Sequence, residues 1–72
     1  MNIAKSFGSR LRFLRKEHNI SQEKLAELSG LHRPYISSLE QGFRNPTIAT
    51  LYSIANALNI DISYLVMDIG NK

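Results

Sequence analysis

The sequence contains no cysteine among its 72 residues, which excludes disulfide bonds and thiolate metal sites and favours a reducing cytosolic environment. It also has no long apolar run. Nothing near the N-terminus resembles a signal peptide, and no window reaches the roughly 20 apolar residues that a membrane-spanning helix needs. Repeats, low-complexity tracts and linkers are absent from the sequence as well. We therefore expect residues 1–72 to form one soluble, cytoplasmic domain.

The residue patterns typical of enzymes are missing too. The sequence has no glycine-rich phosphate loop, no nucleophile elbow and no pair of carboxylates set in an apolar stretch. Its two histidines, His18 and His32, have no cysteine to join them in a metal site. We therefore expect a protein that is not an enzyme and that has no cofactor, metal ion or small-molecule ligand.

Hydrophobic residues make up 43% of the chain and charged residues 21%, which is typical of a compact globule. A chain of this length can form only a small core, so a partner subunit would help to stabilise it. The net charge is +3, and five bases against one acid give residues 1–20 a charge of +4. This basic segment favours a polyanionic partner, although a solvated helix face can carry the same charge.

Apolar spacing and capping residues predict an all-α fold, a compact five-helix bundle. The expected helices span about Ser6–His18, Gln22–Ser29, Arg33–Gln41, the residues after Thr47 to Leu58, and those after Asp61 to about Met67. Ser21, Thr47 and Asp61 are the candidate N-caps. Gly30 can end the second helix because glycine tolerates positive φ, and Pro34 fits the first turn of the third helix.

Residues 21–42 carry the most informative pattern. Two short helices can cross steeply if the residue at their closest approach is small, as Ala26 is, and if the turn is left-handed, as Gly30 allows. Apolar residues stand at the offsets that face inward from both helices: Leu25, Leu31, Ile36 and Leu39. Together these features predict a DNA-binding helix-turn-helix. A helical hairpin that only packs can show the same pattern.

If the third helix enters the major groove, its first residues and those one turn further along face the base edges. The candidate base contacts are His32, Arg33, Pro34, Ser37 and Ser38. Arg33 is the best candidate because a guanidinium pairs bidentately with guanine, and a phosphate contact is its alternative. For His32 the alternative is a helix cap, and for the two serines it is an ordinary solvated helix face.

Phosphate contacts are expected from residues that flank the motif. The candidates are Gln22, Tyr35, Arg44, Asn45, Arg10 and Arg12. Gln22 begins the second helix, where its side chain and the free backbone amides can hold one phosphate oxygen. Tyr35 can donate to a phosphate, but a tyrosine that is exposed without a role is the alternative.

Several short segments carry a resemblance to a known family, and together they span nearly the whole chain. They are Ser21–Ala26, Gly30, Ile36, Leu39–Gly42, Pro46 and Ile54–Leu58. In these the sequence resembles the lambdoid phage repressor and Cro-type family (the lambda repressor-like DNA-binding domain). The run His32–Ser37 and the pair Arg44-Asn45 are similar to the controller proteins of restriction-modification systems. Those proteins often have a hydroxyl residue where this chain has Pro34.

The resemblance implies a short dimeric regulator of transcription and assigns roles to particular residues. Gln22 and Arg44 are implied as phosphate contacts. The family often pairs an arginine of the first helix with a glutamate of the third, which implies a partly buried structural ion pair between Arg15 and Glu40. Because loss of one partner leaves a buried charge uncompensated, we expect this pair to matter for folding.

The C-terminal part has more apolar residues than one face of a short helix can bury. They are Ile60, Ile62, Tyr64, Leu65, Val66, Met67 and Ile69. Self-association would cover the exposed ones, so we expect a homodimer interface within residues 48–69, formed by Tyr52, Ile62, Tyr64 and Met67. The alternative is that this tail packs on the first helix and completes the core.

These observations predict a sequence-specific transcriptional regulator that binds double-stranded DNA as a homodimer. A symmetric dimer spaces its recognition helices by about 34 Å, one DNA turn, and binds inverted half-sites of a pseudo-palindromic operator. The sequence does not indicate whether the regulator represses or activates. Two alternatives remain: an antitoxin-type module that binds a partner protein, for which only residues 68–72 are left over, and a fragment of a longer repressor.

Overall fold

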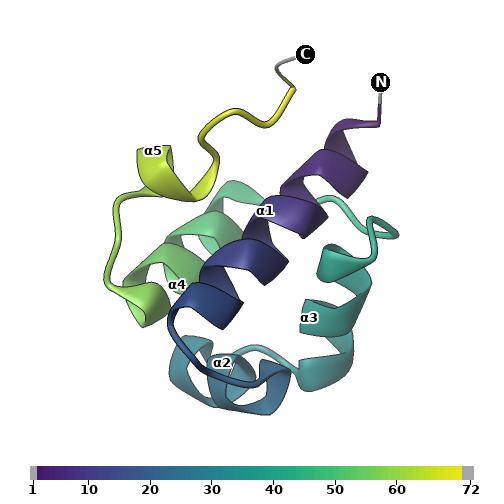
Figure 1. The fold of residues 1–72 in the computed structure, drawn as a ribbon. Coiled ribbons are helices and arrows are strands. Elements are labelled where there is room, and N and C mark those ends of the chain that lie inside the picture. The colour runs from purple at the N-terminus through teal and green to yellow at the C-terminus, as the bar shows by residue number, and fades with distance from the viewer. Residues whose placement is uncertain (1, 71–72) are drawn as a thin grey trace.

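The structure, a computed structural model, describes residues 2–70. These residues form five α-helices and no strand (Figure 1). The helices are α1 (Ile3–Glu17), α2 (Gln22–Ser29), α3 (Arg33–Glu40), α4 (Ile48–Leu58) and α5 (Ile62–Leu65). The predicted all-α class and five-helix order are therefore confirmed. No helix in this part of the chain is long and apolar enough to cross a membrane.

The helix ends follow local capping. Ser21 and Thr47 cap α2 and α4 as predicted, since each hydroxyl accepts a hydrogen bond from the backbone amide three residues later. Helix α1 begins at Ile3 rather than Ser6 because the side chain of Asn2 caps it. The side chain of Asp61 makes no capping bond, and α5 ends earlier than predicted. Helix α3 ends one residue earlier than predicted.

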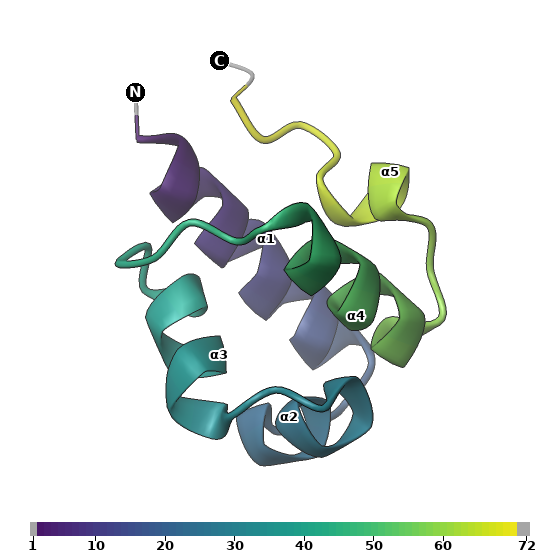
Figure 2. The ribbon, with the colours of Figure 1, turned by 180° about the vertical axis from the view of Figure 1, so that it is seen from behind.

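The core lies where the five helices meet. Eleven apolar side chains from all five helices are buried there: Phe7, Leu11, Leu14, Leu25, Ala26, Ile36, Leu39, Ile54, Ala55, Leu58 and Leu65. Figures 1 and 2 show α1 on one face of the molecule and α4 on the other, with α2 closing the bottom. In both views α3 and α5 lie on opposite sides of the molecule, so α5 does not cover the outer side of α3.

Glycine sets the closest approach between α1 and α3. A Cβ on Gly8 would lie 2.4 Å from the carbonyl oxygen of Leu39 and 2.5 Å from that of Glu40, distances that real Cβ atoms do not reach. Only glycine therefore lets these two helix backbones approach so closely. The turn between α2 and α3 is left-handed at Gly30, with φ of 76°, as predicted.

The C-terminal segment completes the core to a large extent, as in the alternative considered for it. Leu65 is fully buried, and four further residues pack half-buried against the core: Ile60, Ile62, Val66 and Ile69. Tyr64 and Met67 remain 44% and 46% exposed. The apolar surface left for a partner is therefore smaller than the sequence count predicts.

Candidate DNA interface

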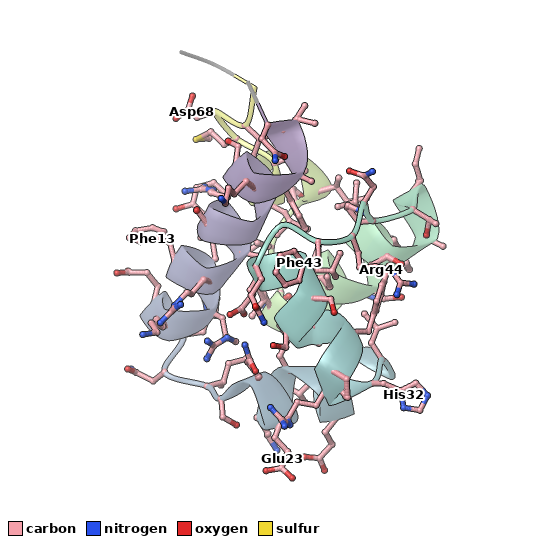
Figure 3. The ribbon with its side chains drawn as sticks, turned by 90° about the vertical axis from the view of Figure 1, so that its right-hand side faces the viewer. Phe13, Glu23, His32, Phe43, Arg44 and Asp68 are labelled. Atoms are coloured by element: carbon pink, nitrogen blue, oxygen red, sulfur yellow. The ribbon has the colours of Figure 1, made fainter. Side chains whose placement is uncertain are left out.

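Helix α3 is anchored by its apolar face and presents its N-terminal end to solvent. Ile36 and Leu39 are fully buried, while His32, Arg33 and Pro34 are exposed. Figure 3 shows His32 projecting from the molecule beside the start of this helix. A helix held from behind by two buried side chains can present its free end to another molecule as a rigid unit.

His32 occupies the N-cap position, but its side chain makes no capping hydrogen bond. The imidazole is therefore not used as the helix cap that the sequence left as an alternative. Pro34 lies in the first turn, where its missing amide hydrogen removes no helical hydrogen bond. This end of α3 therefore presents the guanidinium of Arg33 and the ring of Pro34 beside the imidazole of His32.

The serines of α3 lie further along the helix and are half-buried. The Ser37 hydroxyl accepts a hydrogen bond of 2.9 Å from Nε2 of Gln41, the residue that ends the helix. Gln41 is exposed and shares the face of Arg33 and Ser37, since residues four apart lie above one another on a helix. Gln41 is not among the residues predicted from the sequence, although this spacing is visible there.

A buried ion pair ties α1 to the end of α3. Nε of Arg15 donates to Oε2 of Glu40 over 2.6 Å, and Nη2 donates to Oε1 over 3.1 Å. Nη1 of Arg15 donates to the carbonyl oxygen of Ile20 over 2.8 Å. The two side chains are only 10% and 3% exposed. Arg15 and Glu40 therefore form the structural pair that the family resemblance implies, here with both carboxylate oxygens engaged.

Gln22 connects this ion pair to the exposed end of α3. Its Nε2 donates to Oε1 of Glu40 over 3.0 Å, and its Oε1 accepts from Nη1 of Arg33 over 3.4 Å. The side chain of Gln22 therefore has protein partners on both sides. In the first turn of α2 the backbone amide of Lys24 donates to Ser21, and the amides of Gln22 and Glu23 remain to face an anion.

The loop that follows α3 carries a second cation, that of Arg44. Its guanidinium carbon lies 5.4 Å from the centre of the Tyr35 ring, a cation–π arrangement. The hydroxyl of Tyr35 is 3.2 Å from Oγ1 of Thr50, a residue buried in α4. Tyr35 is half-buried. Its hydroxyl links α3 to α4, and its ring packs against Arg44.

The loop after α3 also exposes two residues beside Arg44. Asn45 is exposed, and Phe43 is 74% exposed. Figure 3 shows Arg44 and His32 on the same side of the molecule. Arg44 and Asn45 of this segment are among the residues predicted from the sequence, whereas Phe43 is not, because its exposure depends on where the loop runs.

Arg10, predicted as a phosphate contact, has partners within the protein. Its Nη2 donates to the carbonyl oxygen of Tyr64 over 2.8 Å, and its guanidinium carbon lies 4.7 Å from the centre of the Tyr64 ring. Phe13 flanks the same cation at 5.9 Å. This guanidinium links α1 to α5. Arg12 is exposed.

The residues predicted for a dimer interface lie on α4 and at α5. Tyr52 is 59% exposed, and Tyr64 and Met67 are exposed as described, whereas Ile62 is half-buried. Ile48, at the start of α4, is 79% exposed and was not among the predicted residues. Within residues 2–70 no three histidine or acidic side chains gather in a way that could hold a metal ion.

The arrangement places two supported cations beside one anchored helix. Arg33 is held by an amide from α2, and Arg44 is held by an aromatic ring of α3 itself. Helix α3 has 8 residues, and an α-helix with its side chains is about 10–12 Å in diameter, which fits the width of the DNA major groove.

Comparison with known proteins gives a consistent result. The chain is 44% identical over 72 residues to Control protein C.SmaI of Serratia marcescens, covering 100% of this chain and 86% of that protein. It is 43% identical over 60 residues to Control protein C.BamHI of Bacillus amyloliquefaciens, covering 82% and 74%. The crystal structure of the restriction-modification controller protein C.AhdI from Aeromonas hydrophila matches with a TM-score of 0.84 at 44% identity, covering 86% of this chain and 94% of that one.

These likenesses confirm the resemblance to helix-turn-helix regulators and to controller proteins. The family model HTH_3, described as helix-turn-helix, matches residues 11–65 and so includes the motif, the buried ion pair and α4. With its fold, its left-handed turn at Gly30 and this match over most of its length, the chain belongs to the HTH_3 helix-turn-helix family.

Proposed function

We propose that this protein is a sequence-specific DNA-binding regulator of transcription that controls a restriction-modification system. The observation that carries the proposal is the exposed N-terminal end of α3, which presents Arg33 while Ile36 and Leu39 anchor the helix in the core. The likeness to control proteins along the whole chain supports the restriction-modification role. A regulator of this kind acts where the DNA is, in the cytoplasm of a bacterial host.

In this proposal α3 lies in the major groove and reads the base edges. Arg33 pairs bidentately with a guanine, the commonest specific contact of an arginine. His32, Pro34, Ser37 and Ser38 lie close to the same base pairs, the serines as small donors and acceptors. Pro34 contributes shape and apolar contact, because it has no side-chain hydrogen-bonding group.

Phosphate contacts flank this helix. Arg44 and Asn45 hold the backbone on one side of the groove, and Arg12 holds it further along α1. The first turn of α2, beginning at Gln22, offers backbone amides to a phosphate oxygen. Tyr35 takes part by supporting Arg44, since its own hydroxyl faces Thr50.

A homodimer completes the proposed assembly. The proposed interface consists of the exposed Tyr52, Tyr64 and Met67 and the half-buried Ile62. Because α5 lies on the opposite side of the molecule from α3, pairing through it leaves both recognition helices free. Two such helices about 34 Å apart bind inverted half-sites.

Footprinting on the DNA that flanks the coding region tests the proposal. We expect one protected pseudo-palindrome. Calorimetry gives a second test: if the protein shows no heat of binding with any duplex at modest ionic strength, the proposed function is wrong. On the protected site, Arg33→Ala should lower affinity about 5-fold to 150-fold, the loss of one bidentate base contact. Its affinity for random DNA should hardly change.

Arg44→Ala is the matched control, because it removes the same kind of side chain from the loop that follows α3. It should weaken binding to the operator and to random DNA alike and reduce the salt dependence by about one phosphate contact. Equal losses on both DNAs for Arg33→Ala would reassign Arg33 to the phosphate backbone.

A further inference from the structure

The turn that follows α3 fixes the backbone of Phe43. Gly42 is left-handed, with φ of 82°, and its amide donates to the carbonyl oxygen of Leu39 over 3.1 Å. The amide of Phe43 donates to the carbonyl oxygen of Ser38 over 3.0 Å. These two bonds form a Schellman motif, the common way in which a helix ends at a glycine. The Cα atom of Phe43 therefore has a set position relative to α3.

The side chain of Phe43 lacks the contact that this motif usually provides. An apolar residue at this place normally packs on the helix residue whose carbonyl accepts its amide. Here that residue is Ser38, whose short side chain ends in a hydroxyl and offers little apolar surface. The ring of Phe43 is 74% exposed. Folding therefore leaves this ring free to contact another molecule.

The residues around Phe43 lie in the proposed DNA interface. Gln41, two residues before it, shares the exposed face of Arg33 and Ser37 on α3. Arg44, the residue after it, is exposed and is a proposed phosphate contact. Figure 3 looks onto the side of the molecule that bears α3 and shows Phe43 and Arg44 beside this helix. A duplex that contacts both neighbours also meets the ring.

The chemistry of the ring narrows the group that it contacts on the duplex. A phenyl ring has no charge and no hydrogen-bonding group, so it does not hold a phosphate oxygen. The apolar group that base edges present in the major groove is the C5-methyl of thymine, and phenylalanine is among the side chains suited to contact it. Such a contact removes apolar surface of both partners from water.

We propose that Phe43 contacts a thymine methyl group in each half-site and so contributes to base specificity. The inference rests on the proposed function, because it requires a duplex held by α3. A contact to phosphate adds affinity for every sequence alike, whereas a contact to a thymine methyl favours one orientation of an A·T pair at one position. The operator preference therefore includes a base pair beside those that Arg33 reads.

Single replacements of operator thymine by deoxyuridine test the contact, since they remove the methyl group and keep the base pairing. In the parent protein we expect one thymine per half-site at which the replacement lowers the affinity about 4-fold, the effect of one buried methyl group. Phe43→Ala should bind the unmodified operator more weakly than the parent. At that thymine the same replacement should lower its affinity no further.

Two variants serve as controls. Phe13→Ala removes the same kind of side chain from α1, where it is 52% exposed, and should respond to deoxyuridine as the parent does. Phe43→Leu keeps an apolar side chain of smaller area and should retain part of the response. Because Phe43 is outside the core, its variants should fold as the parent does.

Three results would overturn the inference while leaving the proposed function intact. The parent protects its operator but responds to deoxyuridine at no position, or Phe43→Ala responds at every position as the parent does. Alternatively, sedimentation equilibrium without DNA gives a lower mass for Phe43→Ala than for the parent, which would place the ring in a contact between two copies of the chain. A parent protein that protects no DNA is a different outcome, because it overturns the proposed function and the inference with it.

Discussion

Replacing Arg15 with alanine leaves the carboxylate of Glu40 in the core without its cationic partner. That side chain is 3% exposed, and the Arg15 side chain is 10% exposed, so water cannot replace the lost hydrogen bonds without opening the structure. Gln22 then remains as the one side chain that still bonds to Glu40. Removal of one member of a buried ion pair costs about 3–5 kcal/mol of unfolding free energy.

That cost is large for so small a domain. At about 0.05–0.15 kcal/mol per residue, a chain of 72 residues has an unfolding free energy of about 4–11 kcal/mol. Each kcal/mol shifts the melting temperature of a domain of this size by about 4–8 °C, so Arg15→Ala should melt at least about 12 °C lower. Urea unfolding followed by circular dichroism, at one protein concentration, measures the loss.

Two variants show whether the reasoning is right. Arg12→Ala removes an exposed arginine from the same helix and should change the unfolding free energy by no more than about 0.5 kcal/mol. The double variant Arg15→Met/Glu40→Leu removes both charges and should recover most of the loss, because no unpaired charge remains buried. An Arg15→Ala protein that melts with the parent would refute the reasoning and place this ion pair among weak surface pairs.

Other substitutions test the remaining parts of the structure. Gly8→Ala places a Cβ against the carbonyl oxygen of Leu39 and should lower the unfolding free energy by about 1–3 kcal/mol. An unchanged thermal melt would mean that α1 and α3 separate at little cost. Tyr35→Phe removes the hydrogen bond to Thr50 and should lower the unfolding free energy by about 0.5–1.5 kcal/mol, while the affinity for random DNA stays as in the parent. Weaker binding to random DNA would show that the hydroxyl donates to a phosphate. Tyr52→Glu adds a charge to the proposed dimer interface and should shift sedimentation equilibrium toward monomer, so an unchanged mass would exclude this surface.

The sequence predicts much of the fold because its signals are local. Ser21, Thr47 and Gly30 mark helix ends through their own side chains or backbone, and apolar spacing of three and four places the buried faces. The motif at residues 21–42 is recognisable for the same reason, since its turn and its small residue are close in sequence. Helix ends that differ, such as the start of α1 at Ile3, depend on a cap that the apolar pattern does not mark.

The candidate site is predicted in part. The exposed end of α3 follows from helical periodicity, so His32, Arg33 and Pro34 could be named before the structure was known. The hydrogen-bond partners of these side chains could not be predicted from the sequence. Arg10 and Arg12 are two residues apart on α1, yet one is fastened to Tyr64 and the other is exposed.

The helices, the motif and the basic end of the recognition helix can be predicted from local sequence, because these depend on residues within a few positions of one another. Tertiary packing alone brings α1 and α3 into contact at Gly8, places the tail on the core, and joins Glu40 to Arg33 through Gln22. Each of these features depends on side chains or backbone from different elements. Their distances are set when the helices pack together, and no local pattern records them.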